Sequence, residues 1–339
     1  MQEVRAEEVQ AREIGGRSWG SALTAKYLAV SVKEEIVLFA LGGLEEIKRI
    51  RTPEKETEIR RIEFDKSNES VAGICCFGGA VLVYDVDREA VVQRLEEPGC
   101  EVKSVGFDGE GRLAFSTREG SVWIWKRSAE GEWEIEEIIE YSDADVKTVV
   151  WSGSSLITTG YDGEVVVYSR WEDEMCSVKW EIEEIIKEDS TVWDAAVTSE
   201  KVPYLAAVTQ SGHFLMYRKN SAWERVFSEK VSTYPVTSVC LCAIEGAEYF
   251  AAVVNRNTLV LFNKKGQNAF RKKILDEYDE PVDIVFSKEA SAVFITSTSY
   301  RKMVRKTKIT KITLSCTGSS HVEDRAGSEG GVDGSESGH

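Results

Sequence analysis

Residues 100–125 read "CEVKSVGFDGEGRLAFSTREGSVWIW", and residues 144–168 read "ADVKTVVWSGSSLITTGYDGEVVVY". Each stretch contains an alternating apolar segment, a turn, a segment of small residues, a polar turn and an apolar run that ends in an aromatic residue. Alternation with a period of two is typical of β-strands, and the Glu-Gly and Asp-Gly pairs are typical of hairpin turns. The repeated pattern therefore predicts two copies of one antiparallel β-sheet unit.

The apolar closing run of this unit recurs along the chain. It ends in an aromatic residue at six positions: Phe39, Tyr84, Trp125, Tyr168, Tyr217 and Phe262. These positions are 45, 41, 43, 49 and 45 residues apart, and a weaker seventh run follows Lys302. A period of about 40 to 45 residues with several short strands per unit is typical of WD40 repeats, whose blades are four-stranded sheets. The sequence thus predicts an all-β fold, a seven-bladed WD40-type β-propeller.

The two ends of the chain have different predicted roles. The segment "EVRAEEVQARE" near the N-terminus belongs to no repeat, so we expect it to supply the outer strand of the seventh blade and to close the propeller over residues 1–314. Residues 315–339 are rich in Gly, Ser and acid and nearly lack large apolar side chains, which predicts a disordered tail. The Gly-His and Trp-Asp pairs that usually tie such blades are mostly missing, so packing between blades is expected to hold the ring.

Composition narrows the range of functions. The net charge of −16 disfavours nonspecific binding to nucleic acid or anionic lipid, and no apolar run suggests a membrane span or a signal peptide. Seven Cys without metal-ligand spacing predict reduced, mostly buried thiols in the cytosol. With only three His and no phosphate-binding loop or Ser-His-Asp arrangement, we expect no catalytic activity, no cofactor and no metal site.

Two charged stretches have simple structural interpretations. The runs "EWEIEEIIEYSD" (132–143) and "KWEIEEIIKED" (179–189) alternate Glu with Ile, which predicts outer blade strands with a solvated face rather than a metal site. The basic run "YRKMVRKTKITK" (300–311) could contact nucleic acid or an acidic protein, but a solvated strand of blade seven is favoured.

Function is expected on the rim formed by the entrances of the first strands and by the turns between the second and third strands. The second position of the first strand reads Trp19, Arg60, Lys103, Lys147, Trp193, Thr237 and Asp283 around the ring. The position before the tight turn reads Val32, Phe77, Arg118, Tyr161, Gln210 and Asn255. Because Trp, Tyr and Arg are enriched at binding hot spots, the predicted partner-binding residues are Trp19, Arg60, Lys103, Arg118, Lys147, Tyr161 and Trp193. An ordinary solvated rim is the alternative.

The first-strand motifs carry a resemblance to a known family. "SWGSAL", "IRRIEF", "VKSVGF", "VKTVVW" and "VWDAAV", together with "STREGSVWIW" and "TGYDGEVVVY", resemble the WD40-repeat family of the cytosolic iron–sulfur protein assembly targeting complex. The resemblance covers most of residues 17–312. It implies a non-catalytic scaffold, monomeric outside its complex, that joins a small assembly factor and a helical-repeat scaffold. Such a complex delivers clusters to apoproteins of the cytosol and also the nucleus.

The resemblance also implies a kind of ligand, because some clients of the family end in an acidic and aromatic tail. The four rim cations would suit its carboxylates, and Trp19, Trp193 or Tyr161 could stack on its ring. A WD40 scaffold of another pathway, such as a chromatin or ubiquitin-ligase adaptor, stays open, since the fold alone does not distinguish partners.

Overall fold

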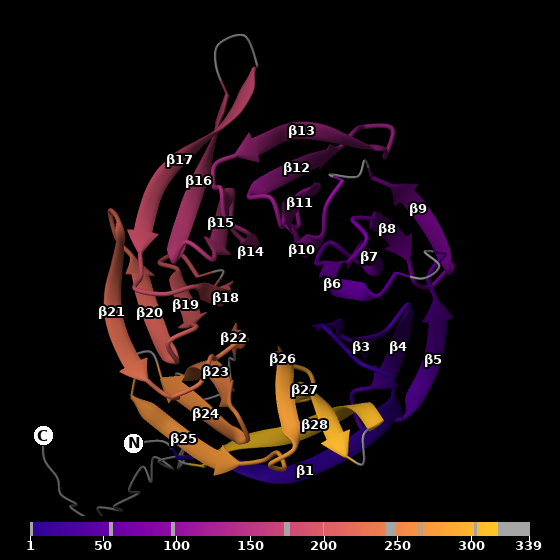
Figure 1. The fold of residues 1–339 in the computed structure, drawn as a ribbon, viewed down its shortest axis with the longest axis vertical. Coiled ribbons are helices and arrows are strands. Elements are labelled where there is room, and N and C mark those ends of the chain that lie inside the picture. Colours follow the sequence, from indigo (N-terminus) through magenta and orange to yellow (C-terminus); the bar gives the residue numbers. More distant parts are fainter. Residues whose placement is uncertain are drawn as a thin grey trace, which may run out of the picture.

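The computed structural model describes residues 3–53, 57–95, 99–172, 177–198, 200–241, 249–263, 265, 267–301 and 304–317. These residues form seven four-stranded antiparallel sheets and no helix. The sheets stand radially around a central channel (Figure 1). The predicted all-β propeller is confirmed.

The four strands of each sheet are arranged one after another from the channel to the outside of the ring. The innermost strands are β2 (Ser21–Leu23), β6 (Ile59–Asp65), β10 (Val102–Phe107), β14 (Val146–Ser152), β18 (Val192–Val197), β22 (Val239–Leu241) and β26 (Asp279–Ser287). The second strands are β3 (Tyr27–Val32), β7 (Asn68–Cys76), β11 (Arg112–Thr117), β15 (Ser155–Gly160), β19 (Tyr204–Thr209), β23 (Tyr249–Asn255) and β27 (Ala292–Arg301). The third strands are β4 (Glu35–Ala40), β8 (Val81–Asp85), β12 (Ser121–Arg127), β16 (Glu164–Glu172), β20 (His213–Lys219), β24 (Thr258–Asn263) and β28 (Val304–Thr317). The outer strands are β5 (Glu46–Arg51), β9 (Ala90–Arg94), β13 (Trp133–Glu140), β17 (Val178–Lys187), β21 (Trp223–Lys230), β25 (Asn268–Lys273) and β1 (Glu3–Gly15).

The predicted closing runs are the third strands, and their apolar residues build the core. Because successive side chains of a strand point to opposite faces, each third strand packs on both neighbouring blades. In β12, for example, Trp125 lies in a cluster with Val83 of β8, while Ile124 lies in a cluster with Tyr168 of β16. The core is therefore a ring of clusters between blades rather than one central cluster.

The tight turns before the third strands touch the next blade. Gly120 has a φ of +82°, which L residues rarely adopt, and a Cβ there would lie 1.7 Å from the carbonyl oxygen of Ser142. Gly163 repeats this arrangement against the carbonyl oxygen of Glu188. Glycine is thus required at these turns for packing between blades as well as for turn geometry.

The N-terminal strand lies in the same sheet as the C-terminal strands. β1 pairs with β28 from Glu3 opposite Thr317 to Gly15 opposite Lys306, and its Val4 and Ile14 are buried. β28 ends at Thr317, so it includes residues 315–317, the first three residues of the predicted tail. The rest of that predicted tail, residues 318–339, lies outside the described residues.

The basic run at 300–311 is less solvated than predicted. Lys308 Nζ lies 2.8 Å from the Asp279 carboxylate, and Lys311 is buried and donates to the carbonyl oxygen of Gly42. Only part of the described run, including Arg305 and Lys306, is exposed. The expectation was wrong for Lys308 and Lys311 because β28 is an inner strand, with β1 on one side and β27 on the other, and both side chains find partners within the fold.

A repeated hydrogen bond ties the outer strands, in addition to the packing that the sequence predicts. A side chain in one outer strand accepts the backbone N–H of a buried Trp in the next, an arrangement that we call the outer clasp. Its three examples are Gln93 to Trp133 at 2.7 Å, Glu137 to Trp180 at 2.7 Å and Glu184 to Trp223 at 3.0 Å. The clasp supplies polar ties where the usual motif pairs are missing.

Two further expectations concern cysteines and membranes. Cys75, Cys76 and Cys240 are buried, as predicted for strand thiols. Among the described residues there is no helix with the length and hydrophobicity needed to cross a bilayer.

Candidate protein-binding site at the channel mouth

A β-bulge at the start of the innermost strands places the predicted rim residues. In β6, β10, β14 and β18 the pairing register skips one residue, and the skipped residues are Arg60, Lys103, Lys147 and Trp193. A bulged residue leaves the ladder and its side chain is turned away from the usual alternation. The bulges therefore explain why these positions, and not their neighbours, project at the channel mouth.

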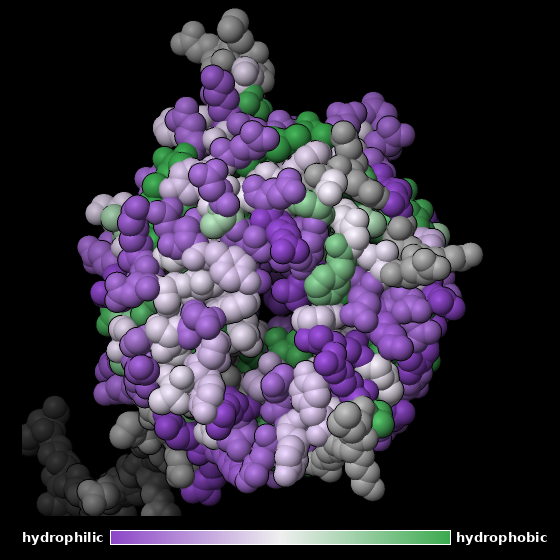
Figure 2. Space-filling model, in the orientation of Figure 1, coloured by the Kyte–Doolittle hydropathy of each residue, from purple (hydrophilic) through white to green (hydrophobic). Residues whose placement is uncertain are grey.

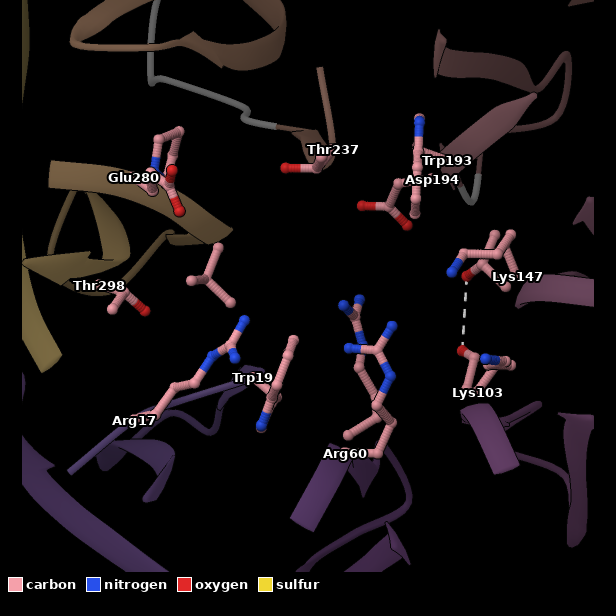
Figure 3. Close-up of a pocket in the computed structure, with 15 residues that line it drawn as sticks. Arg17, Trp19, Arg60, Lys103, Lys147, Trp193, Asp194, Thr237, Glu280 and Thr298 are labelled. Carbon is pink, nitrogen blue, oxygen red and sulfur yellow. Dashed lines mark hydrogen bonds between the residues drawn. The ribbon is translucent and has the colours of Figure 1, made fainter. Parts of the chain in front are cut away.

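Five of the seven predicted partner-binding residues meet in one cavity of about 200 Å³ at the channel mouth (Figure 3). They are Trp19, Arg60, Lys103, Lys147 and Trp193. Figure 2 shows the central hollow of the ring bordered mainly by hydrophilic residues. Arg118 and Tyr161 do not line the cavity and stand beside it on the rim, where both are exposed.

The sequence predicts Asp283 on the rim of blade seven, but the residue at that position is Val282. The bulge of β26 skips Val282, which lines the cavity with Pro281 and Glu280. Asp283 is only 1% exposed and its carboxylate accepts hydrogen bonds from Ser21 and Ser238. The prediction of Asp283 on the rim is therefore wrong, because the register of this strand cannot be read from the alternation alone.

An acid of the following blade contacts each of three consecutive rim residues, in a series that we call the acid relay. Trp19 Nε1 donates to Glu58 at 2.7 Å, Arg60 Nε lies 3.5 Å from Glu101, and Lys103 Nζ lies 3.0 Å from Asp145. Each acid stands two residues before the rim residue of its own blade. The equivalent position before Trp193 is Thr191, so the relay supplies no acid to Lys147.

Lys103 is consequently not free to bind a partner as the sequence suggested. It is 8% exposed, and its ammonium also lies 2.7 Å from Glu101 of its own blade. Two carboxylates within ion-pair distance satisfy its charge.

Lys147 is the buried cation without an ion pair among the described residues of the cavity wall. It is 7% exposed, and its Nζ lies 4.4 Å from the ring centroid of Trp193 and 4.9 Å from that of Tyr161. Burial, followed by the charges of Arg60 and Lys103, lowers the pKa of Lys147 to about 8. An anion in the cavity would therefore gain a strong electrostatic contact with it.

The opposite wall is a stack of arginines and aromatic rings. The Arg17 guanidinium lies 3.4 Å from the ring centroid of Trp19, and that of Arg60 lies 5.3 Å from the same ring. Trp19 also packs edge-on against Phe77, with ring centroids 4.9 Å apart. Burial lowers the pKa of Arg60, yet the group stays cationic at neutral pH.

Tyr161 and Arg118, the two predicted residues outside the cavity, have different surroundings. Tyr161 packs edge-on against Trp193 at 5.6 Å, and so helps to hold Lys147. Arg118 is 66% exposed and lies 3.9 Å from Glu101, too far for a strong ion pair. Arg118 is thus the most accessible of the four predicted cations.

Sequence reasoning missed four charged residues of the cavity: Arg17, Arg61, Asp194 and Glu280. Arg61 Nη1 lies 3.5 Å from Asp283, and this carboxylate raises the pKa of Arg61. Burial raises the pKa of Asp194 to about 6, although Arg61 opposes the rise. Arg61 and Asp194 directly follow the bulged Arg60 and Trp193, so the bulges would have revealed them.

The arrangement can bind an anionic group against aromatic walls. Arg17, Arg60 and Lys147 have no ion pair shorter than 3.5 Å among the described residues, and Trp19 and Trp193 flank the cavity. Within the described part of the chain, no group of three or more His, Cys, Asp or Glu side chains could hold a metal ion. The chemistry of the site is thus recognition of acidic and aromatic groups.

Fold and site define a β-propeller with a cationic, aromatic channel mouth, and comparisons with known proteins add to this description. No known family profile matches the chain. Over 70 residues, 18% of this chain and 16% of the relative, it is 42% identical to "Probable cytosolic iron-sulfur protein assembly protein 1" of Chaetomium globosum. Over 69 residues, 20% of this chain and 21% of the relative, it is 30% identical to the protein of the same name from Yarrowia lipolytica. The matched part thus spans about a fifth of the curated relatives.

Among solved structures, the chain resembles a chain of the crystal structure of the mitotic checkpoint complex. The TM-score is 0.71 and the match covers 91% of both chains, but the sequence identity is 13%. This similarity establishes the propeller fold and says nothing about function.

Proposed function

We propose that this chain is a non-catalytic scaffold of cytosolic iron–sulfur protein assembly, which helps to deliver clusters to apoproteins. The local similarity to two curated proteins named for this process carries the proposal. It fits the motif resemblance over residues 17–312 and the cationic, aromatic lining of the cavity at the channel mouth. In this proposal the seven sheets are the blades of a WD40-type ring, which the pairing of β1 with β28 closes.

The channel mouth is the proposed contact with acidic partner segments. Lys147 and Arg60 would receive carboxylates, and Trp193 and Trp19 would pack on apolar or aromatic side chains. Arg118 and Tyr161 would widen this contact on the rim, while Lys103 would hold Glu101 and Asp145 in place. The partners in this proposal are the small assembly factor, the helical-repeat scaffold and apoprotein clients, met in the cytosol and also in the nucleus.

The test is affinity capture from cytosol of the source organism, followed by mass spectrometry. Wild-type chain should recover iron–sulfur assembly proteins and cluster-containing clients. Thr191→Glu supplies the acid that the relay lacks at Lys147, so it should neutralise that cation without removing it and should reduce client recovery. Thr191→Gln, of similar size but uncharged, should leave recovery unchanged.

The outcomes separate the pathway from the site. Recovery of a different partner set by the wild-type chain would refute the iron–sulfur proposal and leave the propeller unaffected. Recovery of the expected set, equal for Thr191→Glu and Thr191→Gln, would refute the role of Lys147. Circular dichroism of each variant provides the control for folding.

A further inference from the structure

A sequence of seven residues occurs twice on the outer surface of neighbouring blades. β13 begins "WEIEEII" at Trp133–Ile139, and β17 contains "WEIEEII" at Trp180–Ile186. The fold accounts for part of this repeat, because both Trp residues are buried and Glu137 and Glu184 form the outer clasp. It does not account for the first two isoleucines of each copy, Ile135 and Ile138 in β13 and Ile182 and Ile185 in β17, which are 38–41% exposed.

A second set of β-bulges brings the exposed isoleucines onto one face of each strand. In β17 the register shifts so that Ile182 pairs with Tyr168 and Ile185 pairs with Val166. In β13 the same shift sets Ile135 opposite Trp125 and Ile138 opposite Trp123. The residues opposite each pair of isoleucines are two positions apart on their own strand, so their side chains lie on one face of the sheet. The two isoleucines of each strand therefore lie together on that face. The same apolar pair is thus presented twice, on adjacent blades.

Exposed acidic side chains lie on both faces of these strands: Glu140, opposite Ser121, shares the face of the isoleucines, whereas Glu134, opposite Lys126, and Glu181, opposite Ser169, lie on the other face. Glu134, Glu140 and Glu181 are exposed, and none has an ion pair among the described residues. By contrast Glu136 lies 3.4 Å from both Arg112 and Arg170, and so belongs to the fold. The exposed part of the repeat is therefore negative and apolar, the complement of a basic segment with apolar side chains.

Both strands also offer an open hydrogen-bonding edge. β13 and β17 are the outer strands of their sheets, so one side of each backbone pairs with no described strand, although the outer clasp occupies the N–H groups of Trp133 and Trp180 at their starts. The hairpin of β16 and β17 projects beyond the ring (Figure 1), and Trp171 on it is 61% exposed. An open edge with alternating side chains is the arrangement that binds extended peptides by strand addition.

We propose that the outer face of β13 and β17 is a docking surface for an extended basic segment of a partner protein. The segment pairs along a strand edge, its Lys or Arg side chains face the unpaired glutamates, and its apolar side chains cover the isoleucines. This surface lies on the outside of the blades, away from the channel mouth, so the inference does not depend on the proposed function.

The test uses a peptide of eight residues, the length of β13, in which Lys and Val alternate. Binding to the full chain is measured by fluorescence anisotropy, and we expect a dissociation constant below about 1 mM that weakens as salt is raised. In a background of Ile135→Ser/Ile138→Ser, which removes the copy on β13, the double variant Ile182→Ser/Ile185→Ser should weaken binding about tenfold, because the remaining two partly buried side chains lose their apolar contact. In the same background, the control Ile47→Ser/Val226→Ser changes two apolar residues of β5 and β21 that are 56% and 46% exposed, and it should bind as the background does.

Two altered peptides test the chemistry of the occupant. Replacement of Val by Ser tests the apolar contact, and backbone N-methylation of alternate residues tests strand addition; each should abolish binding. Absence of binding by the Lys-Val peptide, equal binding by the Ser or N-methylated peptide, or equal loss in both double variants would overturn the proposal. Circular dichroism of both double variants excludes unfolding as the cause of lost binding.

Discussion

The buried cation at the channel mouth should reduce the stability of the protein. Lys147 has an ordinary pKa of 10.5 when unfolded and about 8 in the fold, so its protonated form is disfavoured by about 3 kcal/mol on folding. Its contacts with Trp193 and Tyr161 return about 1–2 kcal/mol. Lys147→Met keeps the bulk and removes the charge, so we expect it to stabilise the protein by about 1–2 kcal/mol at neutral pH.

The pH dependence of this gain follows from the direction of the pKa shift. Below pH 8 the lysine is protonated in both states and the full cost is present. Between pH 8 and 10.5 the unfolded chain binds more protons than the folded one, so the stability of the wild type rises with pH. The advantage of Lys147→Met should therefore vanish by about pH 10.

Urea unfolding followed by tryptophan fluorescence at several pH values measures this difference. Lys126→Met is the control, because Lys126 is exposed on β12 and should change stability by less than about 0.5 kcal/mol at any pH. The reasoning is refuted if Lys147→Met is less stable than wild type at pH 7. A stability difference that stays constant from neutral to alkaline pH would refute it equally.

Three further predictions address the fold. Glu137→Ala removes the side chain that accepts the N–H of the buried Trp180 in the outer clasp. It should lower the free energy of unfolding in urea by about 2 kcal/mol and reduce the hydrogen-exchange protection of that amide. Glu134→Ala, at an exposed position of the same strand, should leave both almost unchanged. Arg61→Met leaves the buried Asp283 without its cation and should cost about 4 kcal/mol, while Arg60→Met should have a small effect; equal losses in thermal denaturation would contradict this assignment. Deletion of residues 1–15 exposes the edge of β28 and the cores around Val4 and Ile14, so the cooperative thermal transition should be lost. A truncated chain that melts as sharply as the full one would show that β1 is dispensable.

The all-β propeller could be predicted because its determinants are local. The closing runs at Phe39 through Phe262 alternate with the period of a strand, and the Gly120 and Gly163 turns stand at the predicted offsets. Blade seven was harder, since its basic third strand lacks the apolar run, and its pairing with β1 rather than its own composition places it in the sheet.

The candidate site could be predicted only in part, because two of its determinants are not local. Positional counting found Arg60, Lys103, Lys147 and Trp193, and the bulges that project them are visible only in the strand pairing. Counting could not show which cations are paired, since each acid of the relay comes from the next blade. It therefore treated Lys103 and Lys147 as equivalent, although their environments differ.

That difference locates the part of the rim with the greatest capacity to bind. In the acid relay Glu58 and Asp145 pair with Trp19 and Lys103, Glu101 approaches Arg60 only to 3.5 Å, and the series stops where Thr191 stands in place of an acid. A buried, unpaired cation costs stability, and a folded protein keeps it without loss only where a ligand supplies the missing charge. An acidic partner at the channel mouth should accordingly raise the melting temperature of the wild type more than that of Thr191→Glu, in which the ion pair already exists. The break in the relay at Lys147 thus connects the stability of the fold to the binding proposed for it.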